Sequence, residues 1–239
     1  MNRTLKVLVV ALVTLGALST IGASAAWGQK QGILTSASPV ALKGEETGEL
    51  LQNASTSTLG SFTCPGSIYA GHKYNVTPHT WIPIGATTAT ITPSYASECK
   101  AHIPILGTRP GTVTMNGCDY VGHIGETTGG ENTYGLTVDV VCPEGKQIER
   151  EIFKSGSVTH AAADRICTTK IKPQTGLKGA HVKTTTETDD IDMEGTIEGI
   201  HEESSGTLCG STTSATGKLD IDLTVTGEAS PGAGVTVSD

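Results

Sequence analysis

The sequence predicts an all-β protein of antiparallel, sandwich-like architecture, with disulfides that clip its hairpins. Three observations support this class. Threonine (37 copies) and glycine (30 copies) dominate the 239 residues, and long runs of helix-forming residues are missing. Several segments alternate apolar and polar residues, as half-buried strands do. The six cysteines form an even set without any CxxC pair, which is typical of a disulfide framework.

The first 25 residues are expected to form a signal peptide. Arg3 and Lys6 provide a basic region, an apolar stretch follows to about Ile21, and Ala23–Ala25 provides the small residues that signal peptidase recognises. A membrane anchor is the alternative, but the uninterrupted apolar run is shorter than the roughly 20 residues that cross a bilayer. We therefore expect cleavage before Ala26, a secreted, extracellular protein, and no integral membrane segment in the mature chain.

The expected strands follow in order from alternation and from the turn signals between segments. One or two entry strands are expected within residues 31–60. Further strands are predicted near residues 61–70, 86–95, 111–123, 134–142, 147–153, 166–172, 179–187, 193–201 and 217–226. The Ala-rich patch at 161–165 predicts one helical turn, and residues 229–239 predict a disordered tail. The strands would form two β units, residues 26–155 and 156–228, or one larger domain.

The cysteine positions predict a pairing. Opposite residues of an antiparallel hairpin are equidistant from its turn, and their separation suits a disulfide. Cys118 and Cys142 have their midpoint at Gly130, within the turn-like GETTGGEN. The midpoints of the other consecutive pairs fall between Trp81 and Ile82 and at Thr188, beside further turn signals. We predict that each bridge clips the base of one hairpin, although six cysteines allow other pairings. The predicted bridges are Cys64–Cys99, Cys118–Cys142 and Cys167–Cys209.

Charge and composition exclude some functions. The formal net charge is −8, and removal of Arg3 and Lys6 leaves 14 basic against 24 acidic residues, or about −10. No basic stripe is present, so nucleic acid is disfavoured as a partner. Aromatic residues make up 4% of the chain, so its core must be thin, and disulfides would support it.

Two segments are candidate binding sites. The proline-bounded loop NVTPHTWIPIG would present Trp81 and Ile82 at a tip, where an aromatic side chain can anchor a glycan or protein partner. Alternatively, Trp81 packs back onto the sheet. The acidic residues of DIDMEGTIEGIH match oxygen-ligand positions of an EF-hand-type calcium loop, but the twelfth position is His201. The alternative is one solvated strand face. The matching acidic residues are Asp190, Asp192, Glu194 and Glu198.

Catalytic motifs are missing, so we do not expect an enzyme. No G-x-S-x-G elbow occurs, and bridged cysteines cannot act as nucleophiles. The alternative is an extracellular hydrolase of a polymer that uses a carboxylate pair, drawn from Asp119, Asp139, Glu151 and Asp164. A calcium-dependent binding module is a further alternative. The favoured hypothesis is a structural or binding role at or outside the cell envelope, without a cofactor, with an unknown ligand and a cell-envelope glycan or protein as partner.

Three short motifs occur in a specific order along the chain. They lie at Tyr95–Cys99, Asn116–Tyr120 and Cys142–Gly145. In this order the sequence is similar to a group of exported bacterial six-cysteine β-proteins of unknown function. The resemblance implies a secreted, disulfide-bearing β-protein, and it transfers no catalytic residue, ligand or partner.

Overall fold

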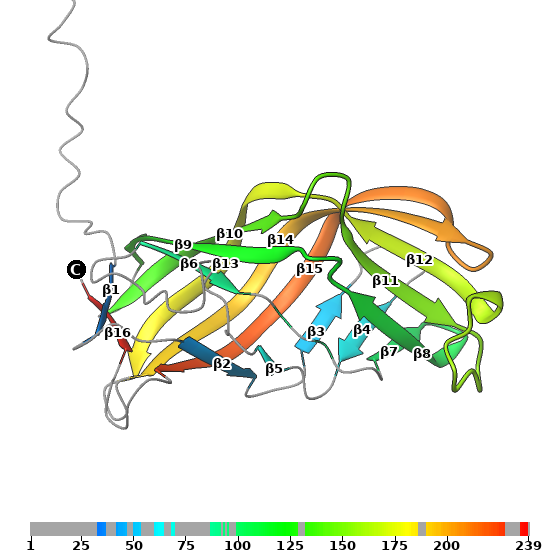
Figure 1. Cartoon of the computed structure of the whole chain (residues 1–239), viewed down its shortest axis with the longest axis horizontal. Helices are drawn as coiled ribbons and strands as arrows, with labels where there is room; N and C mark the ends of the chain where they lie inside the picture. The colour runs from blue at the N-terminus through cyan, green and yellow to red at the C-terminus, as the bar shows by residue number, and fades with distance from the viewer. Residues whose placement is uncertain are drawn as a thin grey trace, which may run out of the picture. The chain divides into compact units, whose positions relative to one another are not determined.

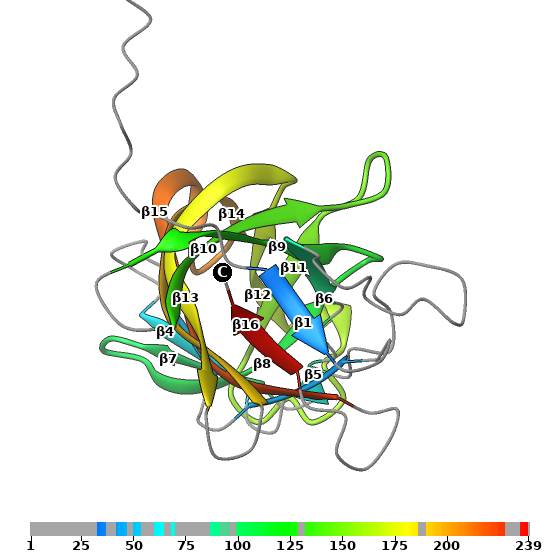
Figure 2. The ribbon, with the colours of Figure 1, turned by 90° about the vertical axis from the view of Figure 1, so that its left-hand side faces the viewer.

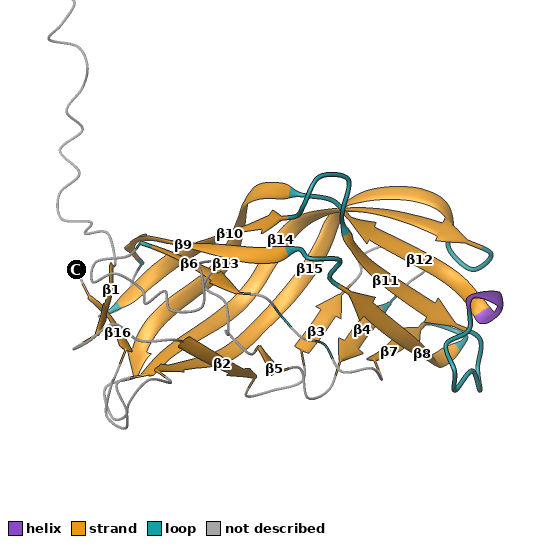
Figure 3. Cartoon of the chain, in the orientation of Figure 1, coloured by secondary structure: helices purple, strands orange, loops and turns teal. Residues whose placement is uncertain are grey.

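The strands form one large antiparallel sheet and one small two-stranded sheet (Figure 1). The computed structural model describes residues 33–36, 42–46, 50–53, 60–64, 68–69, 87–91, 93, 95, 99–128, 132–185, 190–227 and 235–238. Within these residues the only helical element is the 3-10 turn η1 (Ala162–Asp164), which lies in the predicted helical patch (Figure 3). The predicted all-β, antiparallel class is therefore confirmed.

The strand bounds are as follows. The N-terminal strands are β1 (Ile33–Ser36), β2 (Leu42–Glu46), β3 (Leu50–Asn53), β4 (Ser61–Cys64), β5 (Ile68–Tyr69) and β6 (Thr88–Ile91). The central strands are β7 (Cys99–Ile103), β8 (Gly107–Thr114), β9 (Asp119–Thr127), β10 (Thr133–Val141) and β11 (Ile148–Phe153). The C-terminal strands are β12 (Arg165–Ile171), β13 (Gln174–Thr185), β14 (Asp190–Gly206), β15 (Gly210–Gly227) and β16 (Val235–Ser238).

Strand β14 joins two halves of the large sheet. Its N-terminal part pairs with β13, which leads on to β10, β9 and β6. Its C-terminal part pairs with β12, which leads on to β11, β8, β7, β4 and β3. Along its other edge β14 pairs with β15 over nearly its whole length. The long β14–β15 hairpin therefore belongs to both halves.

Each half of the sheet has its own apolar core. The first core contains buried residues of β6, β9, β10, β13, β14 and β15, with Ile148 of β11 and Ile171 of β12. The second core is small, and four of its eight buried residues are cysteines. Tyr95 and Val113 pack against both cores. In the first half the sheet curls until β6, β9 and β10 face β14 and β15, which gives the predicted sandwich-like packing.

The three predicted disulfides are present. Cys118 and Cys142 flank the β9–β10 hairpin, since Asp119 is opposite Val141, and their Cα atoms lie 4.0 Å apart. Cys167 lies in β12 and Cys209 in the β14–β15 turn. Strands β12 and β13 pair in succession with β14, so this bridge ties the first strand of this antiparallel group to the far end of β14.

The Cys64–Cys99 bridge does not close a simple hairpin. Cys64 and Cys99 are at opposite positions of the neighbouring strands β4 and β7, with Cα atoms 4.1 Å apart. The sequence predicts that the segments around Trp81 pair with each other. Instead β5 pairs with β2, and β6 pairs with β9 in the other half of the sheet. The prediction of a hairpin is wrong here because both strands find a longer-range partner.

The segment predicted as one strand over residues 111–123 is two strands. A turn at Met115–Cys118 separates β8 from β9, and the Cys118 amide donates to the Met115 carbonyl oxygen (2.9 Å). Asn116 and Gly117 have φ of 53° and 81°, a combination that an Asn-Gly pair accommodates well. The two strands do not pair with each other, so this turn carries the chain from one half of the sheet to the other.

The two-stranded sheet consists of β1 and β16, which pair in antiparallel register. Strand β16 lies within residues 229–239, where the sequence predicts a disordered tail, and it contacts β13, β14 and β15. Figure 2 views the fold from this end. Strands β11 and β12 flank the predicted boundary at 155/156 and pair with each other. Every described residue belongs to one compact unit, residues 31–239.

Candidate functional site

The buried polar residues of the described chain form a single layer between the two cores. On β11 the inward positions are Ile148 in the first core, then Arg150, then Ile152 in the second core. Strand β12 repeats this order with Ile171, Thr169 and Cys167. Such positions are normally apolar throughout, because burial of a polar group is unfavourable unless it is hydrogen-bonded. We call Arg150, Thr169, Glu202 and Ser204 the polar layer; each is 3% exposed.

Strand register brings the polar layer together. Arg150 is opposite Thr169, and Thr169 is opposite Ser204, so the three form one row across β11, β12 and β14. The hydroxyls of Thr169 and Ser204 are hydrogen-bonded at 3.0 Å. The Arg150 guanidinium donates to Oε1 of Glu202 in a buried ion pair. These contacts satisfy most of the layer internally.

One polar atom in the layer has no partner. Among the described residues, Oε2 of Glu202 is the buried side-chain oxygen or nitrogen without a hydrogen bond. The β14–β15 pairing is irregular around Ile200, and Gly217 of β15 leaves the space that Glu202 occupies. A Cβ at residue 217 would approach Oε1 of Glu202 to 2.7 Å. A buried carboxylate oxygen without a hydrogen-bond partner is rare in native proteins.

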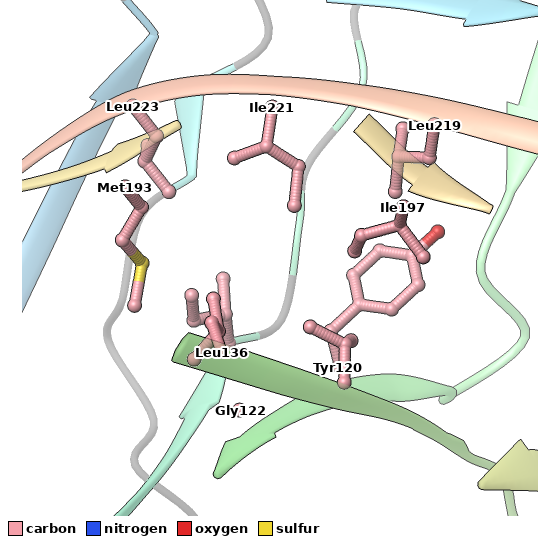
Figure 4. Close-up of a pocket in the computed structure, with 10 residues that line it drawn as sticks. Tyr120, Gly122, Leu136, Met193, Ile197, Leu219, Ile221 and Leu223 are labelled. Atoms are coloured by element: carbon pink, nitrogen blue, oxygen red, sulfur yellow. The ribbon is translucent and has the colours of Figure 1, made fainter. Parts of the chain in front are cut away.

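An apolar cavity lies in the first core. Its volume is about 40 Å³. This exceeds the roughly 10–15 Å³ that one water molecule requires. Figure 4 shows Leu219, Ile221 and Leu223 projecting from β15 toward the opposite strands, with Met193 at one end and Tyr120 at the other. The lining residues are Ile91, Tyr120, Gly122, Leu136, Val138, Met193, Ile197, Leu219, Ile221 and Leu223.

Tyr120 brings a polar group to the wall of the cavity. Its ring lines the cavity beside Ile197 (Figure 4). Its hydroxyl lies 3.5 Å from that of Tyr95. Burial is the main cause that raises the pKa of the Tyr120 hydroxyl. The hydrogen bond to Tyr95 partly opposes this rise. Tyr120 therefore stays neutral to a higher pH than an exposed tyrosine does.

The four acidic residues of the predicted calcium loop lie on β14. Glu194 accepts from Lys183 (2.7 Å) and contacts His181 (3.2 Å), and Glu198 pairs with Lys218. Asp192 accepts from the Thr224 hydroxyl (3.0 Å). The Lys183 hydrogen bond is the main cause that lowers the pKa of Glu194. Asp190, Asp192 and Glu194 are half-buried and Glu198 is exposed. Within the described ranges, no three acidic, histidine or cysteine side chains are close enough to hold a metal ion.

The other predicted site residues are dispersed. Asp139 pairs with His123 (2.9 Å), Glu151 with Arg165, and Asp164 with Lys154 (3.7 Å), so each carboxylate belongs to a separate ion pair. Trp81 and Ile82 lie outside the described residues. All six predicted cysteines are bridged.

Sequence reasoning missed Arg150, Glu202 and Tyr120. The signal for the first is visible in IEREIF, where a basic residue falls between two isoleucines on the same strand face. In GIHEESSG, Glu202 shares its face with Ile200. No local pattern reports that these two faces meet, because 52 residues separate Arg150 and Glu202.

Comparison of the chain with family models, curated proteins and solved structures finds no match. Among the described residues, no helix has both the length and the apolar character to cross a membrane. The three disulfides in an all-β fold define a disulfide-stabilised β-protein, of the kind found in oxidising compartments.

Proposed function

We propose that this chain is an exported binding protein and that its ligand site is the apolar cavity. The observation that carries the proposal is the lining: Tyr120 has the only polar side chain among the ten described lining residues. Cavities of this kind exclude water and accept small apolar molecules or the end of a larger one. The three disulfides and the predicted signal peptide support export.

Methionine-methyl NMR tests the proposal directly. Of the two methionines among the described residues, Met193 lines the cavity, whereas Met115 packs against the first core elsewhere. We expect xenon and n-butane to shift the methyl signal of Met193 in a saturable way and to leave that of Met115 in place. Equal, non-saturating shifts of both signals would contradict a specific site.

Substitutions at two valines test whether the shift of the Met193 methyl signal reports binding inside the cavity. Val138 lines the cavity on β10, and Val182 is fully buried on the neighbouring strand β13 without lining it. Val138→Phe should fill the cavity, abolish the n-butane response and change stability little. Val182→Phe should overpack the core and cost about 1–3 kcal/mol. Unchanged n-butane binding in Val138→Phe would remove the cavity as the site.

A further inference from the structure

Exposed aliphatic side chains gather at one end of the large sheet. Among the described residues, four large apolar side chains are exposed, and three of them lie in two turns. Ile105 (103% exposed) and Leu106 (42%) form the β7–β8 turn, and Val158 (88%) lies in the loop of residues 154–161 after β11. We call Ile105, Leu106 and Val158 the apolar tips. The fourth exposed side chain, Val141, ends β10 in the other half of the sheet.

Strand register brings the apolar tips to the same end. Strand β8 runs antiparallel to β11, with Gly111 opposite Ile152. The start of β8 and the end of β11 therefore lie together, as Figure 1 shows. The β7–β8 turn precedes the start of β8, and the loop with Val158 follows the end of β11. Both turns thus project from one end of the second half of the sheet.

The fold holds Val158 in its exposed position. At the base of its loop, the Lys154 amide donates to the Asp164 carbonyl oxygen (2.9 Å). The Ser157 hydroxyl donates to Oδ2 of Asp164 (3.2 Å), and the His160 ring packs against that of Phe153, with centroids 5.0 Å apart. The loop is therefore fixed on both sides of Val158, so the valine does not turn inward without the loss of these contacts.

The charge around the apolar tips differs from that of the whole chain. The formal net charge of the chain is −8, yet residues 99–118 and 154–163 contain no Asp or Glu. They contain Lys100, Arg109 and Lys154. Arg109 donates to the Thr108 carbonyl oxygen (3.1 Å) and has no ion pair with a described acidic residue. The apolar tips therefore have a basic border in an acidic protein, which favours an anionic partner.

The size of the surface distinguishes between a protein and a lipid partner. A stable protein–protein interface uses about 20–30 residues on each side and needs complementary shapes. The three apolar tips project from two separate turns, which is too little for such an interface. A bilayer needs no complementary shape, because affinity grows with the apolar area that enters it and with the attraction between basic residues and anionic lipids.

We propose that the apolar tips insert into the surface of an anionic lipid bilayer, with Arg109 and Lys154 beside the lipid phosphates. This surface lies outside the cavity, since none of its residues lines the cavity. The inference therefore goes beyond the proposed binding function and does not depend on it.

Co-sedimentation of the intact mature protein with vesicles tests the inference. One set of vesicles contains equal parts of phosphatidylglycerol and phosphatidylcholine, and the other contains phosphatidylcholine alone. We expect saturable, reversible binding to the anionic vesicles that is at least about fivefold tighter than binding to the neutral ones and that weakens with added salt. If the wild-type protein does not bind the anionic vesicles, the inference is wrong.

Aliphatic variants locate the inserted surface. Ile105→Asn and Val158→Asn should each weaken binding to the anionic vesicles at least about fivefold, because less apolar area enters the bilayer. Asparagine accepts the left-handed backbone of residue 105 at lower cost than isoleucine, so unfolding would not explain the loss in Ile105→Asn. The matched control Val141→Asn removes an exposed valine elsewhere and should bind as the wild type does. Equal losses in Val141→Asn and Val158→Asn would overturn the assignment.

A second pair of variants tests the basic border. Arg109→Gln should weaken binding to the anionic vesicles about fivefold, the contribution of one basic residue near an anionic bilayer, and leave binding to the neutral vesicles unchanged. Lys146→Gln is the control, because Lys146 is exposed and precedes the start of β11, at the opposite end of that strand. Equal losses in the two variants would show a general effect of net charge and contradict the proposed orientation.

Sedimentation equilibrium of the same proteins covers the competing occupant. If the wild-type protein forms a dimer that Ile105→Asn abolishes and does not bind vesicles, a second copy covers the apolar tips and the lipid inference is wrong. A wild-type protein that stays monomeric and binds anionic vesicles through Ile105 and Val158 supports it.

Discussion

At the residue scale, Ile105 combines two unfavourable features. It lies in the β7–β8 turn with a φ of 75°, a conformation that a β-branched residue rarely adopts. Its side chain is fully exposed, at 103% of the reference area, so no burial compensates for the backbone strain. Ile105 therefore lowers the free energy of unfolding, and other contacts of the hairpin keep the turn in place.

Ile105→Asn should raise stability by about 1 kcal/mol, because asparagine accepts the left-handed conformation at lower cost. Urea unfolding of the variant against the wild type measures the gain. Leu106→Asn, in the same turn but without a positive φ, is the control and should give no increase. A loss of stability in Ile105→Asn would show that the isoleucine makes a stabilising contact.

The sequence predicts some residue roles better than others. The Cys118–Cys142 pairing was predictable because the two residues flank the base of one hairpin. The Cys64–Cys99 pairing was predicted correctly, but through a hairpin that does not form. Arg150 and Glu202 were not, because their contact depends on which strands become neighbours across 52 residues. Tyr120 was predictable as a strand residue, but its place at the end of a cavity depends on how the sheet curls.

At the element scale, β13 and β14 approach very closely at one point. Gly179 has a φ of 122°, and a Cβ there would lie 1.9 Å from the Thr196 carbonyl oxygen. Gly176 on the same strand also has a positive φ, 75°, but open space around it. The pair therefore separates the effect of close approach from that of backbone conformation.

Gly179→Ala should cost at least about 3 kcal/mol, because the strands must separate to admit a methyl group. Gly176→Ala should cost about 1 kcal/mol, the strain of a left-handed alanine. Chemical denaturation of both variants checks the difference. Equal costs would show that β13 and β14 adjust to the added methyl without loss.

The disulfides differ in what surrounds them. Chain entropy alone assigns each of them roughly 3–4 kcal/mol, since sequence separations of 24, 35 and 42 residues differ little on a logarithmic scale. The second core, however, takes half of its buried residues from cysteines, whereas the first core is mainly aliphatic. Loss of a bridge in the second core removes packing as well as a cross-link.

We expect Cys64→Ala/Cys99→Ala to destabilise the protein by about 1 kcal/mol or more beyond Cys118→Ala/Cys142→Ala, because the former pair belongs to the smaller core. Thermal unfolding of both double variants provides the comparison. Equal losses would mean that the second core depends on cross-linking alone.

The secondary structure shows where prediction from sequence ends. The strands around residues 134–142 and 193–201 were predicted because their inward faces alternate. The strands β8 and β9 were predicted as one strand over residues 111–123, because only residues 115–118 separate them. The neighbours of β5 and β6 could not be predicted, because pairing over long separations depends on the whole sheet.

At the scale of the whole molecule, three perturbed groups act in the same direction at high pH. Burial raises the pKa of Tyr120, and hydrogen bonds to Glu194 and Glu198 raise the pKa of Lys183 and Lys218. The folded protein therefore holds protons that the unfolded chain releases as pH passes the usual values of 10.0 and 10.5. Stability contributed by these groups is fully present below pH 10 and falls as pH rises.

The free energy of unfolding should therefore decrease from about pH 10 upward, and Tyr120→Phe should flatten this decrease. Denaturant unfolding between pH 8 and pH 11, as approximate limits, measures the slope. Lys183→Gln is the comparison, because it removes a half-exposed ion pair and should change the slope less. Identical slopes in Tyr120→Phe and the wild type would mean that Tyr120 ionises as readily when folded.

The shared β14–β15 hairpin also dictates an order of events during biosynthesis. During synthesis from the N-terminus, strands β4 and β7–β12 emerge first. The β14–β15 hairpin, which borders both cores, emerges after them. The Cys64–Cys99 and Cys118–Cys142 bridges can close in this interval, whereas Cys209 follows β14 in the sequence. We therefore expect the Cys167–Cys209 bridge to form last, because it cannot close before β14 has emerged.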